Sequence, residues 1–406
     1  MKRFYLAIAA LLLIGSVALG LGDRKYNLLL VTVDSLRPEV VKTSAPNLSE
    51  MAGASTVFDN AYTIYPETVG SHYTLMTGND YIVKDELATL KFIESFDQAK
   101  NKDYANLASK MKTAGYDTFA YVADQVLNRK IFKYGFGEFQ SQPDNSAVSN
   151  EVVDKIKNIG AGKFFIWAHY KIPNVEGLDY TNRLYSCSED MNKQTDDQFM
   201  QAYSKNVSKI DSEIGRVISA LSETKSGKNT VVVVLGGRGE NFDPKYFGLG
   251  KTLYESDVKT VFMIYDPSKK TQKIDSTVDN SKVADMILGK VIKNDFNEKI
   301  SALKESGMTY FRISYGKNLK VGVSDGKSKF IYNLVTDSCL PEKDASEFYD
   351  LIANPGGEGR DNLMDDPDKQ VKIQQMRDSL SKETRVPIPK PGEEINVLDR
   401  LRNLGY

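Results

Sequence analysis

The 406-residue chain is poor in the residues that most often bind metals or cross-link small proteins, since it has two histidines and two cysteines. Two cysteines are too few for a disulfide scaffold, and zinc clusters are built from close-spaced cysteine pairs that this chain lacks. Cys187 and Cys339 allow one bridge in an oxidising compartment, and two separate buried thiols are the alternative. The sequence therefore does not predict a fold held together by cross-links.

The chain also lacks an excess of charge of one sign. Its 53 Lys and Arg residues balance 54 Asp and Glu residues, which leaves a formal net charge of -1. No global field is available to hold a nucleic acid, so any preference for an anion must be local. The length and the 41% hydrophobic content predict one large core with a smaller satellite and no extensive disorder.

Residues 1–22 have the pattern of an export signal. Two basic residues precede an apolar run from Phe4 to Val17, and small residues follow where a signal peptidase would cut. An uncleaved anchor is the alternative, because residues 4–21 approach the roughly 18 apolar residues that a membrane span needs. We therefore expect an exported protein, periplasmic or in the cell envelope, with membrane association through residues 4–21 if the segment is retained.

Between residues 23 and 308, apolar runs of strand length alternate with apolar residues at helical spacing. Such alternation predicts an α/β fold in which a large, mostly parallel sheet lies between helices. The predicted strands are Tyr26–Val33, Thr118–Val122, Lys163–His169, Asn229–Leu235 and Val258–Tyr265, and helices are predicted around Tyr104–Met111 and Val207–Leu221.

The pattern changes near residue 309. Short strands separated by hairpin turns are predicted at Thr309–Tyr315, Leu319–Val323 and Phe330–Val335. They indicate a small antiparallel subdomain over residues 309–386. Prolines and then leucines at helical spacing predict a linker and a terminal helix in residues 387–406.

The segment from Asn27 to Gly78 resembles the opening of the sulfatase family, within the alkaline phosphatase superfamily. The resemblance rests on Asp34-Ser35-Leu36-Arg37, Ala45-Pro46-Asn47-Leu48, Val57-Phe58-Asp59-Asn60-Ala61-Tyr62, and Ser71-His72 leading to Leu75-Met76-Thr77-Gly78. It implies the fold of a hydrolase of sulfuric or phosphoric esters, in which positive charge, a nucleophile and an acid are brought together.

Three residues match catalytic positions of that family. Asp34 matches the first metal-ligand acid, at the carboxyl end of the first strand. Thr68 stands at the nucleophile position, where classical members oxidise a Cys or Ser to formylglycine; a threonine cannot become that aldehyde. Relatives elsewhere in the superfamily use an unmodified threonine as a phosphoryl acceptor, so Thr68 could still attack, and the alternative is that it caps the following helix. His72 replaces the usual arginine of this turn.

Other positions of the family pattern are altered. Gly237 and Arg238 replace two metal ligands, and Leu249 replaces a histidine ligand. Asn174 stands where relatives have an anion-binding histidine, whereas Lys251 matches a lysine that contacts sulfate. With two histidines in the whole chain, we expect no other imidazole to compensate.

These losses predict a decayed metal centre. A calcium ion takes about six or more oxygen ligands, and Asp34 is the one ligand retained. Arg238 would place a fixed cation beside that carboxylate, in the role of the missing ion, unless it points to solvent. A different cage made by Glu67, Glu240 and Asp243 is the alternative. We therefore expect no cofactor and no formylglycine, with a divalent metal such as calcium only if the chain is active.

The favoured interpretation is an exported, non-catalytic sulfatase-like protein that binds an anionic small molecule or a sulfated or phosphorylated glycan or ester. The cations expected to attract that ligand are Arg37, His72, Lys171, Arg238 and Lys251. One alternative is an active metal-dependent ester hydrolase or transferase that uses Thr68. Another is a structural or partner-binding protein of the cell envelope.

Overall fold

The computed structural model describes residues 26–79, 105–160, 162–172, 193–243, 248, 250–267, 271–315, 318–335, 346–384, 386 and 388–389. Several predictions fall outside these residues: the signal or anchor in residues 1–22, the two cysteines, Asn174, Leu249 and the terminal helix. Among the helices that the structure does describe, none is both long enough and apolar enough to cross a membrane.

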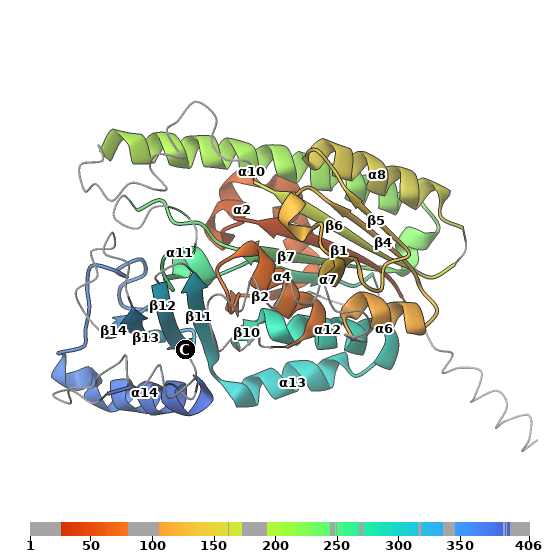
Figure 1. Cartoon of the computed structure of the whole chain (residues 1–406). Coiled ribbons are helices and arrows are strands. Elements are labelled where there is room, and N and C mark those ends of the chain that lie inside the picture. The colour runs from red at the N-terminus through yellow and green to blue at the C-terminus, as the bar shows by residue number, and fades with distance from the viewer. Residues whose placement is uncertain are drawn as a thin grey trace, which may run out of the picture.

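An eight-stranded sheet forms the centre of the molecule, in the order β5-β4-β6-β1-β7-β8-β2-β9 (Figure 1). Only the two pairings made by β8 are antiparallel, so the predicted mostly parallel sheet is confirmed. The strands are β1 (Asn27–Asp34), β2 (Ser55–Phe58), β4 (Asp117–Val122), β5 (Glu138–Ser141), β6 (Phe164–Lys171), β7 (Thr230–Arg238), β8 (Phe262–Tyr265) and β9 (Gln272–Ile274).

Helices cover both faces of this sheet (Figure 1). One layer contains α2 (Pro38–Ser44), α3 (Pro46–Gly53), α8 (Asn145–Asn158) and α10 (Lys193–Ser222). The other contains α4 (Thr68–Thr77), α6 (Leu107–Thr113), α12 (Asn280–Leu288) with a following π-helical turn (Gly289–Lys293), and α13 (Phe296–Ser306). Shorter elements are β3 (Ala61–Tyr62), β10 (Val278–Asp279), α7 (Lys130–Lys133), α11 (Glu255–Val258), and 3-10 turns at Gln125–Leu127, Ser226–Asn229 and Pro367–Lys369.

One predicted strand boundary is wrong. The apolar run that starts at Val258 was expected to be a strand throughout, but Val258 is the last residue of α11, and β8 begins at Phe262. The amide of Val258 donates to the carbonyl of Tyr254. Val258 is fully buried in α11, and an apolar pattern alone does not distinguish a buried helical turn from a buried strand.

The C-terminal part folds on a separate antiparallel sheet, as predicted. Its strands are β11 (Thr309–Tyr315), β12 (Asn318–Ser324), β13 (Ser328–Val335) and β14 (Ser346–Asp350), paired in that order. Helix α14 (Gln370–Thr384), which the sequence pattern did not predict, packs on this sheet through Ile373, Met376 and Leu380. The sheet therefore has an apolar core of its own.

A buried lysine joins the small sheet to the main domain. Lys329 of β13 is fully buried, and its Nζ lies 2.8 Å from Oε1 of Glu255 in α11 and 3.0 Å from Oε1 of Glu358. It also donates to the Leu253 carbonyl at 2.9 Å. Because a buried charge is costly without partners, these contacts tie the two sheets together.

Candidate active-site cluster

Side-chain alternation along the strands places Asp34, His169 and Lys171 on one face of the central sheet, the face under α4. In β1, Leu28 and Leu30 belong to the core under α4, whereas Leu29, Val31 and Val33 belong to the core under α10. Asp34 continues the series that faces α4, because successive strand residues point to opposite faces. In β6, Trp167 faces the same core, so His169 and Lys171 follow it to that side.

The strands on either side bring cations level with Asp34. Asp34 pairs with Lys171 of β6 and with Arg238 of β7 in the parallel register. The pairing with β7 shifts by one residue at this point, since Val33 is opposite Gly236 and Asp34 is opposite Arg238. Gly237 is therefore skipped, and this irregularity places Arg238 beside the acid.

Gly237 and Gly239 have no room for side chains. A Cβ on Gly237 would lie 2.0 Å from Oδ1 of Asp34, and one on Gly239 would lie 2.0 Å from the main-chain oxygen of Ser256. Both distances are far below any contact that real Cβ atoms make. The backbone that carries Arg238 is consequently held close to its neighbours on both sides.

Asp34 is fully buried and receives a hydrogen bond from one hydroxyl. The Oγ1 of Thr68 donates to Asp34 Oδ2 at 2.5 Å, and Arg238 Nε lies 3.9 Å from the same oxygen. Arg238 Nε in turn donates to Thr68 Oγ1 at 3.4 Å. The guanidinium therefore does not grip the carboxylate through two parallel hydrogen bonds, and the threonine hydroxyl bridges the two charges.

The guanidinium of Arg238 is directed inward, with the residue 4% exposed. Its Nη1 donates to Ser35 Oγ at 2.7 Å and to the Gly239 carbonyl at 3.1 Å. Ser35 has a φ of 65°, a left-handed conformation that costs a non-glycine residue about 1 kcal/mol or more. The solvent-facing alternative for Arg238 is thus not what the structure shows.

Thr68 is the first residue of α4, but it is not the cap of this helix. The cap is Glu67, whose carboxylate accepts from the amides of Val69 at 2.9 Å and Gly70 at 2.5 Å. This leaves the Thr68 hydroxyl free to reach Asp34. The capping alternative for Thr68 is therefore wrong, because the Glu67 side chain accepts from the amides at this helix start.

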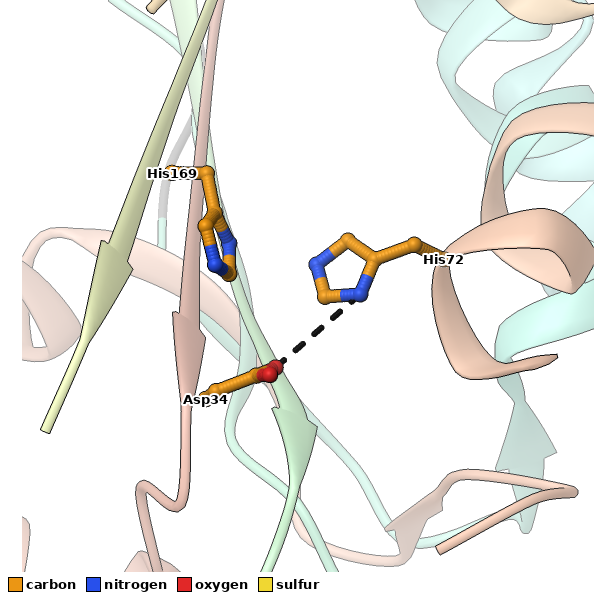
Figure 2. A group of neighbouring side chains, drawn as sticks. All are labelled: Asp34, His72 and His169. Atoms are coloured by element: carbon orange, nitrogen blue, oxygen red, sulfur yellow. Dashed lines mark ion pairs between the residues drawn. The ribbon is translucent and has the colours of Figure 1, made fainter. Parts of the chain in front are cut away.

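Both histidines of the chain lie at Asp34, one from each side (Figure 2). Nδ1 of His72, in α4, is 3.9 Å from Asp34 Oδ1, and the His72 and His169 ring centroids are 4.8 Å apart and perpendicular. From the sequence, no role was predicted for His169 and no second imidazole was expected here. That expectation is wrong: the β1–β6 register brings His169 level with Thr32, two residues before Asp34.

The protonation states follow from burial and neighbours. Burial would raise the pKa of Asp34, but interactions with His72, Arg238 and His169 and the Thr68 hydrogen bond outweigh it, so the pKa is lowered. Burial and the adjacent His72 lower the pKa of His169 to about 3. Burial raises the pKa of Glu67 to about 7, despite its two backbone donors. At neutral pH the cluster thus holds an ionised acid and a neutral His169.

The other predicted cations lie around this centre, and two of them have acidic partners. Lys171 Nζ is 3.0 Å from Asp124 Oδ2 and its side chain is 43% exposed. Arg37 pairs with Glu39 and donates to the Glu240 carbonyl at 3.3 Å. Lys251 is half-buried. The guanidinium that the structure places at the Asp34 carboxylate is that of Arg238, with Nε 3.9 Å from Oδ2.

The fold and the site define the class of this protein. A mostly parallel sheet between helices, an acid at the carboxyl end of its first strand, a hydroxyl opposite it at a helix start and a small antiparallel sheet are the features of an alkaline-phosphatase-like hydrolase fold. The model of the sulfatase family matches residues 27–290. The chain belongs to the sulfatase family.

Known proteins agree with this assignment. A sulfatase of Formosa agariphila is 28% identical over 167 residues, an alignment that spans 39% of this chain and 31% of that protein. A 2-O GAG sulfatase has a similar structure, with a TM-score of 0.67, 16% identity and coverage of 89% of this chain and 93% of that one. A phosphonate monoester hydrolase from Silicibacter pomeroyi has a TM-score of 0.63 and 15% identity, over 89% and 95% of the chains.

The sulfatase family usually works with a divalent metal, and the described residues do not fit a hard ion such as calcium. Position 237 has no space for a carboxylate while Asp34 stands as it does. Of the substitute acids, Glu67 caps α4, and Asp243 pairs with Arg360 at 2.7 Å. Around Asp34, the groups that the structure places within reach of a common ion are the two imidazoles rather than further carboxylates.

Proposed function

We propose that the chain is an exported, non-catalytic sulfatase-family protein that binds a sulfated or phosphorylated ligand at the carboxyl edge of its central sheet. The observation that carries this proposal is Arg238. It lies where the family pattern has a metal ligand, it is buried, and it stands beside Asp34 with a bulged strand and two tightly packed glycines behind it. A fixed cation there supplies charge for an anion in place of the hard divalent ion that the family pattern implies.

The class of ligand is suggested by the structural relatives and by the local charge. One relative, with a TM-score of 0.65 and 14% identity, is described with its substrate D-glucosamine-2-N,6-O-disulfate. Another is described with a neocarrahexaose. In this chain, Lys171 and Arg238 lie on the strands that flank Asp34, at the same level. A sulfated sugar is therefore the first ligand to test.

The test is thermal unfolding and calorimetric titration of the mature chain with D-glucosamine-6-sulfate, glucose-6-phosphate, inorganic sulfate and the uncharged parent sugars. We expect stabilisation by a charged sugar and none by its uncharged parent. Arg238→Gln should weaken binding about tenfold or more, which is about 1.4 kcal/mol. Lys155→Gln is the matched control, because Lys155 pairs with Glu138 at 2.7 Å, away from Asp34.

Two results would remove the proposal. One is the absence of stabilisation by every charged probe. The other is equal binding by Arg238→Gln and Lys155→Gln, since a ligand held at this edge must respond to the cation beside Asp34 and not to a lysine of α8.

A second candidate, an active ester hydrolase or transferase, is favoured by one specific contact. The Thr68 hydroxyl donates to Asp34 at 2.5 Å, which is the orientation a nucleophile would need to lose a proton to a neighbouring base. Aryl sulfate, phosphate monoester and phosphate diester substrates should be assayed with added calcium, magnesium, manganese and zinc. We expect no turnover; turnover that Thr68→Ala abolishes would establish the second candidate in place of the first.

A further inference from the structure

Three buried polar side-chain atoms around Asp34 have no hydrogen-bond partner among the described residues: Oδ1 of Asp34, Nε2 of His72 and Nε2 of His169. Each of the three side chains is fully buried. Buried polar atoms in native proteins are nearly always satisfied, so a group of three that face one another indicates that something binds between them. Figure 2 shows the two rings converging with the carboxylate from a helix and two strands.

In each ring the second nitrogen, Nδ1, already makes a hydrogen bond, and this bond fixes the direction in which Nε2 points. Nδ1 of His72 lies 2.8 Å from the Thr68 carbonyl, and because a carbonyl only accepts, Nδ1 carries the proton and Nε2 has the lone pair. Nδ1 of His169 lies 2.9 Å from Thr32 Oγ1, which also accepts from Trp167 Nε1 at 2.9 Å. A second hydrogen bond of this kind is what orients histidines that bind metals.

We propose that Asp34, His72 and His169 form a site for a borderline divalent transition metal, such as zinc or cobalt, and not for calcium. Two imidazole nitrogens and one carboxylate oxygen are the donor set such ions prefer, with a fourth position left for water or an anion. The site shares Asp34 with the family's metal-ligand pattern but takes both nitrogen donors from residues that are not metal ligands in that pattern. It does not depend on whether the chain binds a sulfated ligand.

The geometry is close to what the ion needs. The three ligand atoms that these residues offer lie within 4.8 Å of one another. Four-coordinate ligands about 2.0–2.2 Å from an ion stand roughly 3.3–3.6 Å apart, so binding draws the donors together by about 1 Å. Small rotations of the three side chains would bring the donors to the distances that the ion needs.

Arg238 is placed so that it opposes the ion without blocking it. Arg238 Nε and the Thr68 hydroxyl both lie at Oδ2 of Asp34, whereas the free oxygen is Oδ1. The guanidinium therefore takes no ligand atom from the metal, and its positive charge lowers the affinity. Arg238→Gln should bind the metal more tightly, by about tenfold.

The chain has two histidines in total, which allows a direct experiment on the wild-type protein. With 15N-labelled histidine and no affinity tag, long-range proton–nitrogen spectra report only these two rings. Titration with zinc should shift the Nε2 resonance of both rings at one equivalent, and calcium should shift neither. Equilibrium dialysis should give one zinc or cobalt ion per chain.

Variants identify the ligands. His72→Asn and His169→Asn should each weaken cobalt binding at least tenfold and change the visible absorption of the bound ion. Lys155→Gln should leave both unchanged. If a histidine variant fails to fold, the wild-type nitrogen spectra still decide the matter, because they need no substitution.

The proposal is overturned if zinc shifts neither histidine, or if metal binds with an unchanged spectrum in both variants. In that case water alone satisfies the three atoms. These outcomes leave the anion-binding function untouched, since that function is read from charged sugars and Arg238. Conversely, metal binding accompanied by ester turnover would sustain the site and refute the non-catalytic assignment.

Discussion

Replacement of Arg238 by glutamine removes one of two opposite charges that are both shielded from solvent. The Arg238 and Asp34 side chains are 5% and 0% exposed, with Nε 3.9 Å from Oδ2. Two unit charges at this separation attract by about 4 kcal/mol at an effective dielectric constant of 20, and breaking a buried pair typically costs 3–5 kcal/mol. Since Asp34 keeps its Thr68 hydrogen bond, we expect Arg238→Gln to lower the free energy of unfolding by about 3 kcal/mol at pH 7.

The loss of stability caused by Arg238→Gln should become smaller as the pH falls. In the wild type the pKa of Asp34 is lowered from 3.8, so this group contributes stability that is present above 3.8 and lost on acidification below it. Without Arg238, one of the interactions that lower the pKa of Asp34 is lost, so the pKa of this group is higher in the folded variant than in the wild type. The variant then gains a proton as the pH falls from 7 toward 4, and the difference in stability between the two proteins narrows.

Urea unfolding followed by circular dichroism at pH 7 and pH 4 measures both effects. Arg37→Gln is the control, because Arg37 pairs with Glu39, which is 54% exposed, and such pairs contribute about 0–1 kcal/mol. Arg238→Gln made in an Asp34→Asn background should cost less than about 1 kcal/mol, since the carboxylate charge is already gone. A loss of equal size at both pH values and in both backgrounds would refute the reasoning.

Three further substitutions test other contacts by urea unfolding. Gly237→Ala places a Cβ 2.0 Å from Asp34 Oδ1 and should cost about 1–3 kcal/mol; if this clash is the cause, the cost shrinks in an Asp34→Ala background. Glu67→Ala removes the acceptor at the start of α4 and should cost about 1 kcal/mol, with Glu67→Gln milder; equal losses would mean that the cap contributes nothing. Lys329→Met leaves the buried Glu358 without its cation, whereas Glu255 keeps Lys259 at 3.4 Å, and should cost about 3 kcal/mol or more. Lys299→Met, in a more exposed pair, should cost under about 1 kcal/mol, and equal losses would contradict a stabilising role for the buried ion pair.

The central sheet could be predicted because its strands are buried on both faces. The runs around β1, β6 and β7 are continuous in apolar residues, and every residue of β1 and β7 is buried. The same runs placed Asp34 and Arg238 at strand ends that meet at one edge. Helix α14 was missed because its apolar positions Ile373, Met376 and Leu380 are sparse among charged residues.

The positions of the side chains around Asp34 depend on the register between neighbouring strands. The residues of one strand do not specify which residues of the next strand they face. His169 follows Trp167 in an apolar strand, so its pattern is that of a core residue, and only the pairing with β1 shows that it faces the acid. The skip at Gly237 is likewise visible only in the pairing of β7 with β1. Glu67 caps α4 from the position before Thr68, which the sequence alone marks only as a glutamate preceding a Thr-x-Gly turn.

The lack of space at Gly237 limits which side chains this edge of the sheet can hold. Oδ1 of Asp34 occupies the volume into which a side chain at 237 would project. An aspartate at position 237 would bring a second carboxylate against that of Asp34, next to the buried guanidinium of Arg238. A carboxylate at position 237 is therefore compatible with this edge of the sheet only if the side chain of Asp34 moves as well.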